Sequence, residues 1–186
     1  MTGSSATTGD LSGRRIAVIG TTGTGKTTLA RSLAQKHGLT HIELDSLFWQ
    51  PGWKPIEMGE FRSLVADAVE ADRWVSDGNY RGVRDIVWSQ ADIILWLDYS
   101  LLLVFWRLFK RNIKQIIERQ VLWGTNQVTI RNAFFCRDSL FFWAAQTYRR
   151  RRREYPELFQ MKEYRHIKVF HFTSPRMTDD WFERVS

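Results

Sequence analysis

The chain has 186 residues, of which 44% are hydrophobic, and this length fits one domain with a core of its own. Its single cysteine, Cys136, excludes an internal disulfide and a cysteine cluster for a metal. We therefore expect one domain over residues 14–186 in a reducing cytoplasm, preceded by a disordered Ser- and Thr-rich tail over residues 1–13.

The net charge is +7 at pH 7, but five of the positive charges are consecutive arginines at residues 149–153. Such a run is compatible with nucleic acid, an acidic membrane surface, a phosphate-rich substrate or a solvated helix face. The longest apolar stretch, residues 93–109, is interrupted by Asp98 and Arg107. Its uncharged part is shorter than the about 20 apolar residues of a membrane span, so we expect no transmembrane segment.

A phosphate-binding loop is the strongest motif of the chain. Residues 20–27 fit the pattern G-x-x-x-x-G-K-[ST], between an apolar strand pattern at residues 16–19 and a helical pattern that follows. In such a loop, backbone N–H groups and the helix N-terminus bind phosphates, Lys26 contacts the β- and γ-phosphates, and the Thr27 hydroxyl ligates Mg²⁺. The sequence therefore predicts an ATP and Mg²⁺ site formed by Gly20, Thr21, Thr22, Gly23, Thr24, Gly25, Lys26, Thr27 and Thr28.

Further strands and helices are predicted to alternate after this loop. Strands are expected at residues 41–45, 74–76, 91–98 and 167–172, and helices at 26–37, 58–71, 101–119, 135–155 and 178–185, the fourth ending before Pro156. This alternation predicts an α/β, three-layer P-loop NTPase fold. It has a mainly parallel sheet of about five strands, helices on both faces and a helical lid, with ligands at the carboxyl ends of the strands.

Three aspartates follow predicted strands: Asp45, Asp77 and Asp98. Asp77 is the best candidate for Mg²⁺, and Asp45 could orient or deprotonate an acceptor hydroxyl. Asp98 is expected to cap the helix that follows it. Capping is the alternative for each of them, but a shared edge of the sheet favours function for Asp45 and Asp77.

Basic and aromatic residues surround these candidates. Arg107, Arg111 and residues 149–153 lie between the last two predicted strands, where a lid over residues 107–153 would stand, although a solvated basic face explains them equally well. Beyond Asp45 lie three aromatic residues, which could stack a flat acceptor such as a base or could instead seal the core. They are Phe48, Trp49 and Trp53.

Two further segments resemble a known family. Residues 44–53 are similar to the Leu-Asp-x-Leu-Phe-Trp-x-Pro-Gly-Trp signature of the bacterial DNA topology modulation proteins, a subfamily of the adenylate-kinase-like P-loop kinases. Residues 77–81, Asp-Gly-Asn-Tyr-Arg, match a segment of that subfamily and, more distantly, the Asp-Gly-Phe-Pro-Arg segment of adenylate kinases. The resemblance extends over residues 15–185.

The resemblance implies roles for particular residues. Asp77 would hold Mg²⁺ through water, Arg81 would bind the transferring or acceptor phosphate, and Arg107 and Arg111 occupy the place of the lid arginines. The expected catalytic residues are Lys26, Asp45, Arg81, Arg107 and Arg111. The expected acceptor-binding residues are Asp45, Phe48, Trp49, Trp53, Asp77 and Arg81. Asn79 and Tyr80 stand where adenylate kinases have Phe-Pro, so the resemblance does not identify AMP as the acceptor.

Together these patterns predict an ATP- and Mg²⁺-dependent phosphotransferase that acts on a small acceptor, with a nucleotide-like molecule as one candidate. The alternatives are a nucleotide-regulated nucleic-acid-binding protein and a polynucleotide-end kinase, which would use residues 149–153 on phosphate backbones. The acceptor itself and the oligomeric state are not determined by these patterns.

Overall fold

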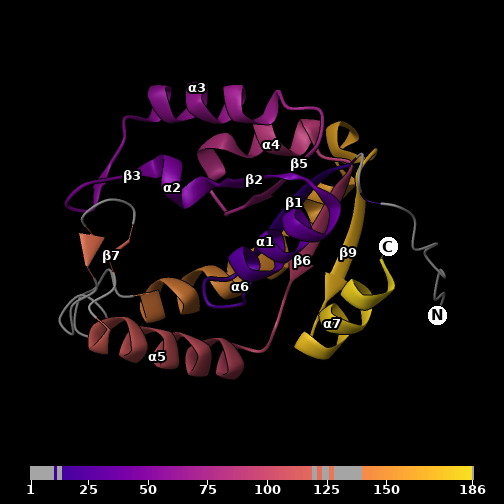
Figure 1. Ribbon diagram of the computed structural model, residues 1–186. Coiled ribbons are helices and arrows are strands. Elements are labelled where there is room, and N and C mark those ends of the chain that lie inside the picture. Colours follow the sequence, from indigo (N-terminus) through magenta and orange to yellow (C-terminus); the bar gives the residue numbers. More distant parts are fainter. Residues whose placement is uncertain (1–10, 12–13, 119–120, 123–125, 128–139, 186) are drawn as a thin grey trace.

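The computed structural model describes residues 11, 14–118, 121–122, 126–127 and 140–185 (Figure 1). Cys136 and nearly all of the predicted N-terminal tail lie outside these residues. The predicted lid region is described only in part: helix α5 (Leu101–Ile117), the paired strands β7 (Val121–Leu122) and β8 (Asn126–Gln127), and helix α6 (Leu140–Gln160). The tail and the lid therefore stay predictions.

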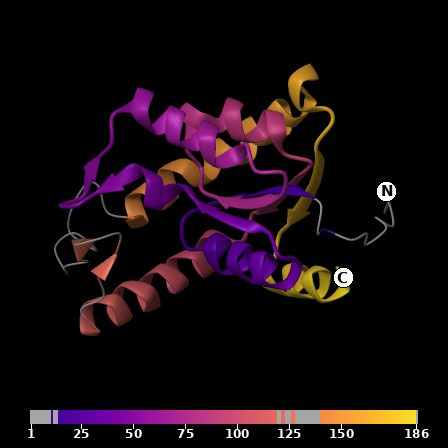
Figure 2. The same cartoon turned by 45° about the horizontal axis from the view of Figure 1, so that its top comes forward.

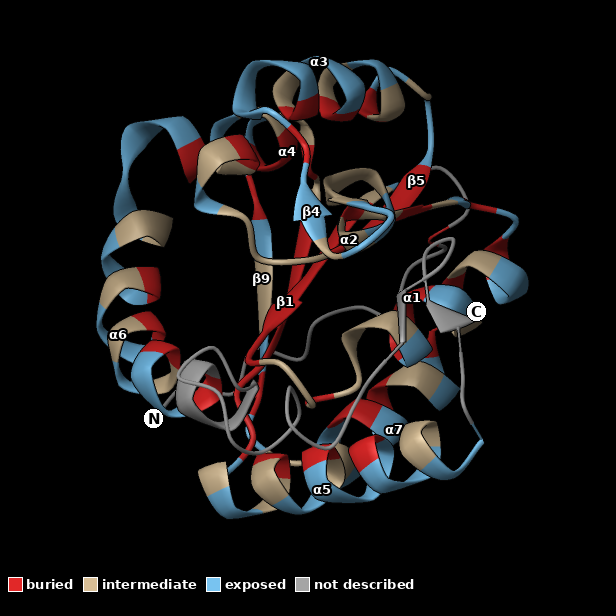
Figure 3. Ribbon diagram, turned by 90° about the vertical axis from the view of Figure 1, so that its left-hand side faces the viewer, coloured by how far each residue is buried: buried red, intermediate tan, exposed pale blue. Residues whose placement is uncertain are grey.

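A sheet of five parallel strands forms the centre of the fold. Its order is β2 (Thr40–Glu43), β5 (Trp74–Asp77), β1 (Arg15–Gly20), β6 (Ile93–Leu97) and β9 (Lys168–Phe172). Strands β1, β5 and β6 are buried over nearly their whole length, which agrees with their almost unbroken apolar sequences (Figure 3). The predicted α/β fold with a mainly parallel, five-stranded sheet is confirmed.

Helices cover both faces of this sheet (Figure 2). Because side chains alternate along a strand, Ile16 and Val18 of β1 face one core, whereas Ala17 and Ile19 face the other. The first core includes side chains of α1 (Lys26–His37), α5 and α7 (Pro175–Arg184). The second includes side chains of α3 (Met58–Val69) and α4 (Arg84–Gln90). Helix α6 contributes Ala144 to the first core and Tyr155 to the second.

Several element boundaries differ from the predictions. The strand predicted to reach Asp45 ends at Glu43, because residues 44–48 form the short helix α2 (Leu44–Phe48). A hairpin of β3 (Trp49–Gln50) and β4 (Lys54–Pro55) follows it. Helix α4 was not predicted, and α6 was wrongly predicted to end before Pro156, which lies inside it.

Helix α7 begins three residues earlier than predicted. Pro175 stands in its first turn and the Ser174 hydroxyl accepts a hydrogen bond from the N–H of Met177 (3.3 Å). A serine followed by proline is a recognisable helix start, so this signal was present in the sequence. Among the helices described, none has the length and the apolar character that a membrane span needs.

Candidate active site

The predicted phosphate loop connects β1 to α1 and packs tightly against its neighbours. Gly20 pairs with Leu97 of β6, and a Cβ atom on Gly20 would lie 2.4 Å from the Leu97 carbonyl oxygen. A Cβ atom on Gly23, which has a φ of +83°, would lie 2.7 Å from Cγ of Leu108 in α5. Only glycine fits these two positions without displacing β6 or α5, so the loop geometry depends on them.

Hydrogen bonds to backbone carbonyls hold the loop closed. The Thr24 hydroxyl and the Lys26 ammonium both donate to the Thr21 carbonyl, at 2.8 and 3.2 Å. From α5, Nη1 of Arg107 donates to the Thr24 carbonyl at 2.8 Å. Helix α1 begins after Gly25 without a side-chain cap on its first N–H groups. Those N–H groups are therefore oriented to bind an anion, as a phosphate site requires.

A hydroxyl and a carboxylate meet beside this helix start. Oγ1 of Thr27 donates to Oδ1 of Asp77 (3.3 Å), and Nε2 of His41 lies 3.0 Å from the other carboxylate oxygen. Asp77 is only 2% exposed. Among the described residues no three His, Cys, Asp or Glu side chains converge, so Mg²⁺ here would take most of its ligands from phosphate and water. The Thr27–Asp77 pair fits such a site.

Asp45 lies in the first turn of α2 and is bound by a tyrosine. Oη of Tyr80 donates to Oδ1 of Asp45 at 2.5 Å. Burial raises the pKa of Tyr80, and the charge of Asp45 raises it further, so the phenol stays protonated as a donor. This bond leaves Oδ2 of Asp45 for another donor.

Lys26 lies at the centre of four charged side chains. Burial lowers its pKa to about 8, the charge of Arg151 lowers it further, and those of Asp45 and Asp77 oppose the shift. Arg111 also acts on Lys26. Desolvation by the surrounding protein lowers the pKa of the Arg111 guanidinium, and the charge of Asp45 opposes that shift. Part of the Arg111 side chain remains exposed to solvent. The two candidate aspartates, the loop lysine and Arg111 thus lie in one electrostatic neighbourhood.

Two other predicted site residues have exposed side chains. Arg81 is exposed at the start of the 3-10 helix η1 (Arg81–Val83), and within the described residues no hydrogen bond or ion pair is formed by it. Thr28 is exposed in the first turn of α1. Arg107 therefore contacts the loop and Arg111 acts on Lys26, whereas Arg81 forms no hydrogen bond or ion pair with either within the described residues.

The three aromatic candidates divide between core and surface. Phe48 packs against Phe61 and Tyr80, with ring centroids 5.0 and 4.6 Å apart, so its role is largely one of packing. Trp49 and Trp53 meet edge to face across the β3–β4 hairpin (5.7 Å) and are partly exposed. Trp53 has a φ of +58°, an unusual conformation for a non-glycine residue.

Two contacts with the loop backbone were not predicted. Asn79 exchanges hydrogen bonds with the backbone of Gly20: its Oδ1 accepts from the Gly20 N–H at 3.3 Å, and its Nδ2 donates to the Gly20 carbonyl. Arg151, 6% exposed, lies 3.5 Å from the same carbonyl. One signal for Arg151 was available, because five consecutive residues of a helix point in all directions, so one of five arginines must face inward.

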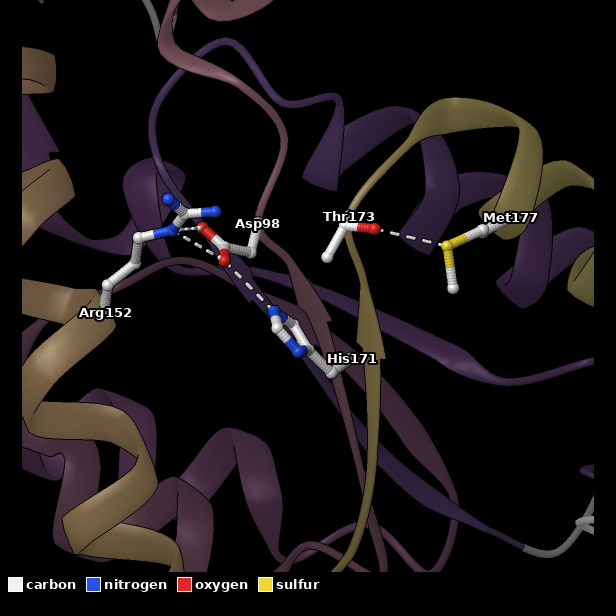
Figure 4. A network of polar contacts seen from close by, with 5 residues as sticks. All are labelled: Asp98, Arg152, His171, Thr173 and Met177. Carbon is white, nitrogen blue, oxygen red and sulfur yellow. Dashed lines mark hydrogen bonds and ion pairs between the residues drawn. The ribbon is translucent and has the colours of Figure 1, made fainter. Parts of the chain in front are cut away.

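The prediction that Asp98 caps α5 is wrong. The Ser100 hydroxyl caps that helix by accepting from the N–H of Leu103. Asp98 instead receives two hydrogen bonds from Nε of Arg152 (2.8 and 2.9 Å) and lies 3.0 Å from Nε2 of His171 (Figure 4). It is 6% exposed. Asp98 therefore joins the end of β6 to α6 and β9, and it directly follows Leu97, which pairs with Gly20 of the loop.

A cavity next to the loop is too small for a substrate. It measures about 20 Å³, which is room for roughly one water molecule, and Ser76, Asn79, Arg84 and Tyr155 are among its lining residues.

Solved structures with a fold similar to that of this chain include several kinases. A shikimate kinase from Bacteroides thetaiotaomicron is similar at a TM-score of 0.54 and 16% identity, over 92% of this chain and 96% of that one. The α/β fold with a parallel five-stranded sheet is thus shared with a kinase that contains a phosphate-binding loop. A shikimate kinase from Acinetobacter baumannii, solved in complex with shikimate, has a TM-score of 0.52 and 14% identity, over 91% and 89% of the two chains.

A sugar kinase from Janibacter sp. HTCC2649 shares the P-loop kinase fold at a TM-score of 0.50 and 20% identity, over 92% and 91% of the two chains. No family model matches the chain, and no curated protein matches it in sequence. At these identities the likenesses show a shared fold. They do not test the resemblance to DNA topology modulation proteins.

Proposed function

We propose that the chain is an ATP- and Mg²⁺-dependent phosphotransferase that moves the γ-phosphate to a hydroxyl or phosphate of a small acceptor. The observation that carries the proposal is the position of Asp45, whose charge acts on both Lys26 of the loop and Arg111 of α5. A nucleotide switch needs only the phosphate loop. A phosphotransferase also needs a group that orients the acceptor hydroxyl and takes its proton, and a carboxylate beside the loop lysine can do both.

The residues divide into donor and acceptor roles. Lys26 and the N-terminus of α1 would bind the β- and γ-phosphates, and Thr27 with Asp77 would hold Mg²⁺. Bound Mg²⁺ neutralises phosphate oxygens and ATP supplies the phosphoryl group. Arg107 and Arg111 stabilise the charge that is transferred. Asp45 orients the acceptor hydroxyl and receives its proton as the new O–P bond forms and the bond to ADP breaks.

The acceptor side is less well defined. Trp49 and Trp53 are partly exposed beyond Asp45 and offer a surface for a flat ring. Arg81 is exposed and available to bind an acceptor phosphate, as the resemblance to adenylate-kinase-like proteins implies. We therefore propose an acceptor that combines a ring with a hydroxyl or phosphate, in a cytoplasmic enzyme.

ATP consumption with a panel of acceptors tests this function. The panel contains nucleoside monophosphates, nucleosides, sugars, shikimate and other small hydroxyl compounds. We expect one class to stimulate ADP formation, and Asp45→Asn to reduce that stimulated rate at least about 100-fold, because a general base contributes about 10² to 10⁴. Asp67→Asn, on the exposed side of α3, is the control that should retain the rate. Turnover that no compound stimulates would count against a kinase.

The nucleic-acid alternative has less support from the arginine run. Arg151 contacts the loop, Arg152 binds Asp98 and Arg150 lies 3.6 Å from Glu154, so three of the five arginines are engaged within the protein. Arg149 and Arg153 are exposed and remain available to a phosphate backbone. Salt-dependent binding of DNA or RNA that is lost on Arg149→Gln/Arg153→Gln would favour this alternative, or a polynucleotide-end kinase if strand ends were also phosphorylated.

A further inference from the structure

Helix α5 carries an apolar stripe on its outer side. Its exposed residues Leu102, Trp106, Ile113 and Ile117 are separated by four, seven and four positions, which places them on one side of a helix. Their exposed fractions are 81, 54, 38 and 75%. The opposite side of α5 faces the first core through Val104 and Leu108. These four exposed residues are called the α5 stripe below.

The α5 stripe is large for a surface that faces water. Trp106 also stacks on the partly exposed Phe109, with ring centroids 6.3 Å apart. Together these side chains expose apolar area on the order of 500 Å², comparable to the largest patches of ordinary monomers, which are often functional. Scattered exposed apolar residues need no explanation, but a continuous row along a helix about 25 Å long indicates a contact surface.

The charges of α5 indicate the chemistry of the partner. Within its 17 residues α5 has four basic side chains and no acidic one. Lys110 lies over the Trp106 ring (4.8 Å), and Lys114 is 68% exposed, with Glu118 just beyond the helix 3.8 Å from its ammonium group, so both lysines flank the stripe. Lysines that border an apolar, Trp-containing helix face are typical of segments that bind at the surface of an anionic membrane.

A second copy of the chain fits this surface less well. Antiparallel pairing of two α5 helices would bring Lys110 of each copy together near the twofold axis, and α5 offers no acid to compensate them. The apolar area is also below the about 800 Å² per partner of a stable interface. Figures 1 and 2 show α5 along an outer edge of the molecule, where a lipid surface can reach it.

We propose that the α5 stripe binds the protein peripherally to an anionic membrane surface. Leu102, Trp106, Ile113 and Ile117 would enter the boundary between headgroups and acyl chains, while Lys110 and Lys114 contact lipid phosphates. On the other side of the same helix Arg107 and Arg111 face the phosphate loop and Asp45. Membrane contact would thus be made by the helix that also supplies the two arginines of the candidate site.

Co-sedimentation of the full chain with vesicles tests the proposal. We expect binding to vesicles of phosphatidylcholine with phosphatidylglycerol, weaker binding to phosphatidylcholine alone, and loss of the difference at about 1 M salt. Leu102→Ser/Ile117→Ser should weaken binding about tenfold or more, because both side chains lose their apolar contact. Lys110→Glu/Lys114→Glu should abolish the preference for the anionic lipid.

The matched control is Leu64→Ser/Met177→Ser, which removes two exposed apolar side chains from α3 and α7 and should bind vesicles like the wild type. Circular dichroism and thermal melting establish that each variant is folded. Three outcomes would overturn the proposal: no vesicle binding by the wild type at low salt, equal loss in the control and stripe variants, or a dimer in light scattering that Leu102→Ser/Ile117→Ser converts to monomer. The last outcome would assign the stripe to a second copy.

Discussion

Lys26 is the residue whose chemistry most directly limits the site. Burial and Arg151 lower the pKa of its ammonium from 10.5 to about 8, so Lys26 is charged below that pH and progressively neutral above it. A neutral amine binds a triphosphate poorly. The free protein should therefore lose affinity for ATP as pH rises through about 8, well before a lysine with an ordinary pKa would do so.

The pH profile of kcat/KM for ATP measures this effect, because it reports ionisations of the free enzyme. Lys26→Arg is the matched variant, since a guanidinium stays charged at high pH, and its profile should not fall near pH 8. A wild-type profile that stays level to pH 10 would show that the charge of Lys26 does not control binding. For stability the sign is opposite: the unfolded chain holds this proton longer, so stability rises with pH between about 8 and 10.5.

Elements that are distant in the sequence meet at the loop, and Asp98 joins two of them. This nearly buried carboxylate accepts two hydrogen bonds from Arg152 of α6 and lies beside His171 of β9. Asp98→Ala would leave Arg152 and His171 without this partner and remove the bond that joins α6 to the sheet edge. We expect a loss of about 2 kcal/mol in the free energy of unfolding, measured by urea denaturation.

An exposed ion pair provides the comparison for Asp98. Arg176 and Asp180 of α7 are 92 and 56% exposed and lie 3.9 Å apart, so Asp180→Ala should change stability by less than about 0.5 kcal/mol. Equal effects of the two substitutions would mean that the Asp98 network contributes no more than a surface pair. If Asp98→Ala lowers the free energy of unfolding more than Asp180→Ala, and Arg152→Ala lowers it equally, the stabilisation comes from the bond between Asp98 and Arg152.

Local patterns predicted the parts of the site that are continuous in sequence. The phosphate loop and the start of α1 follow from residues 16–37 alone, because a strand, three glycines and a helix are adjacent there. Arg151 and Asn79 reach Gly20 from 131 and 59 residues away, and Tyr80 reaches Asp45 from 35. Such contacts depend on strand order and helix packing, which cannot be predicted from the spacing of residues within one segment. Asp98 was misassigned for the same reason, since a capping pattern is local and its partners are not.

At the scale of the molecule, ligand binding at the loop should stabilise the whole domain. The loop packs against β6 and α5, and Arg151 connects it to α6, so opening any of these elements disturbs the phosphate site. A ligand that binds only the native state adds about 2.7 kcal/mol at a concentration of 100 Kd. For a domain of this size each kcal/mol raises Tm by about 2–4 °C, which predicts a rise of about 5–10 °C.

Thermal melting with ATP and Mg²⁺ measures this coupling without any knowledge of the acceptor. Lys26→Ala should melt near the wild-type temperature without ligand and show little shift with it, because the variant keeps the fold but loses the phosphate contact. Chelation of Mg²⁺ should reduce the wild-type shift, since Thr27 and Asp77 then face uncompensated phosphate charge. A full Tm shift in Lys26→Ala would mean that ATP binds elsewhere on the molecule. A wild-type Tm shift that chelation does not change would mean that Thr27 and Asp77 do not bind Mg²⁺.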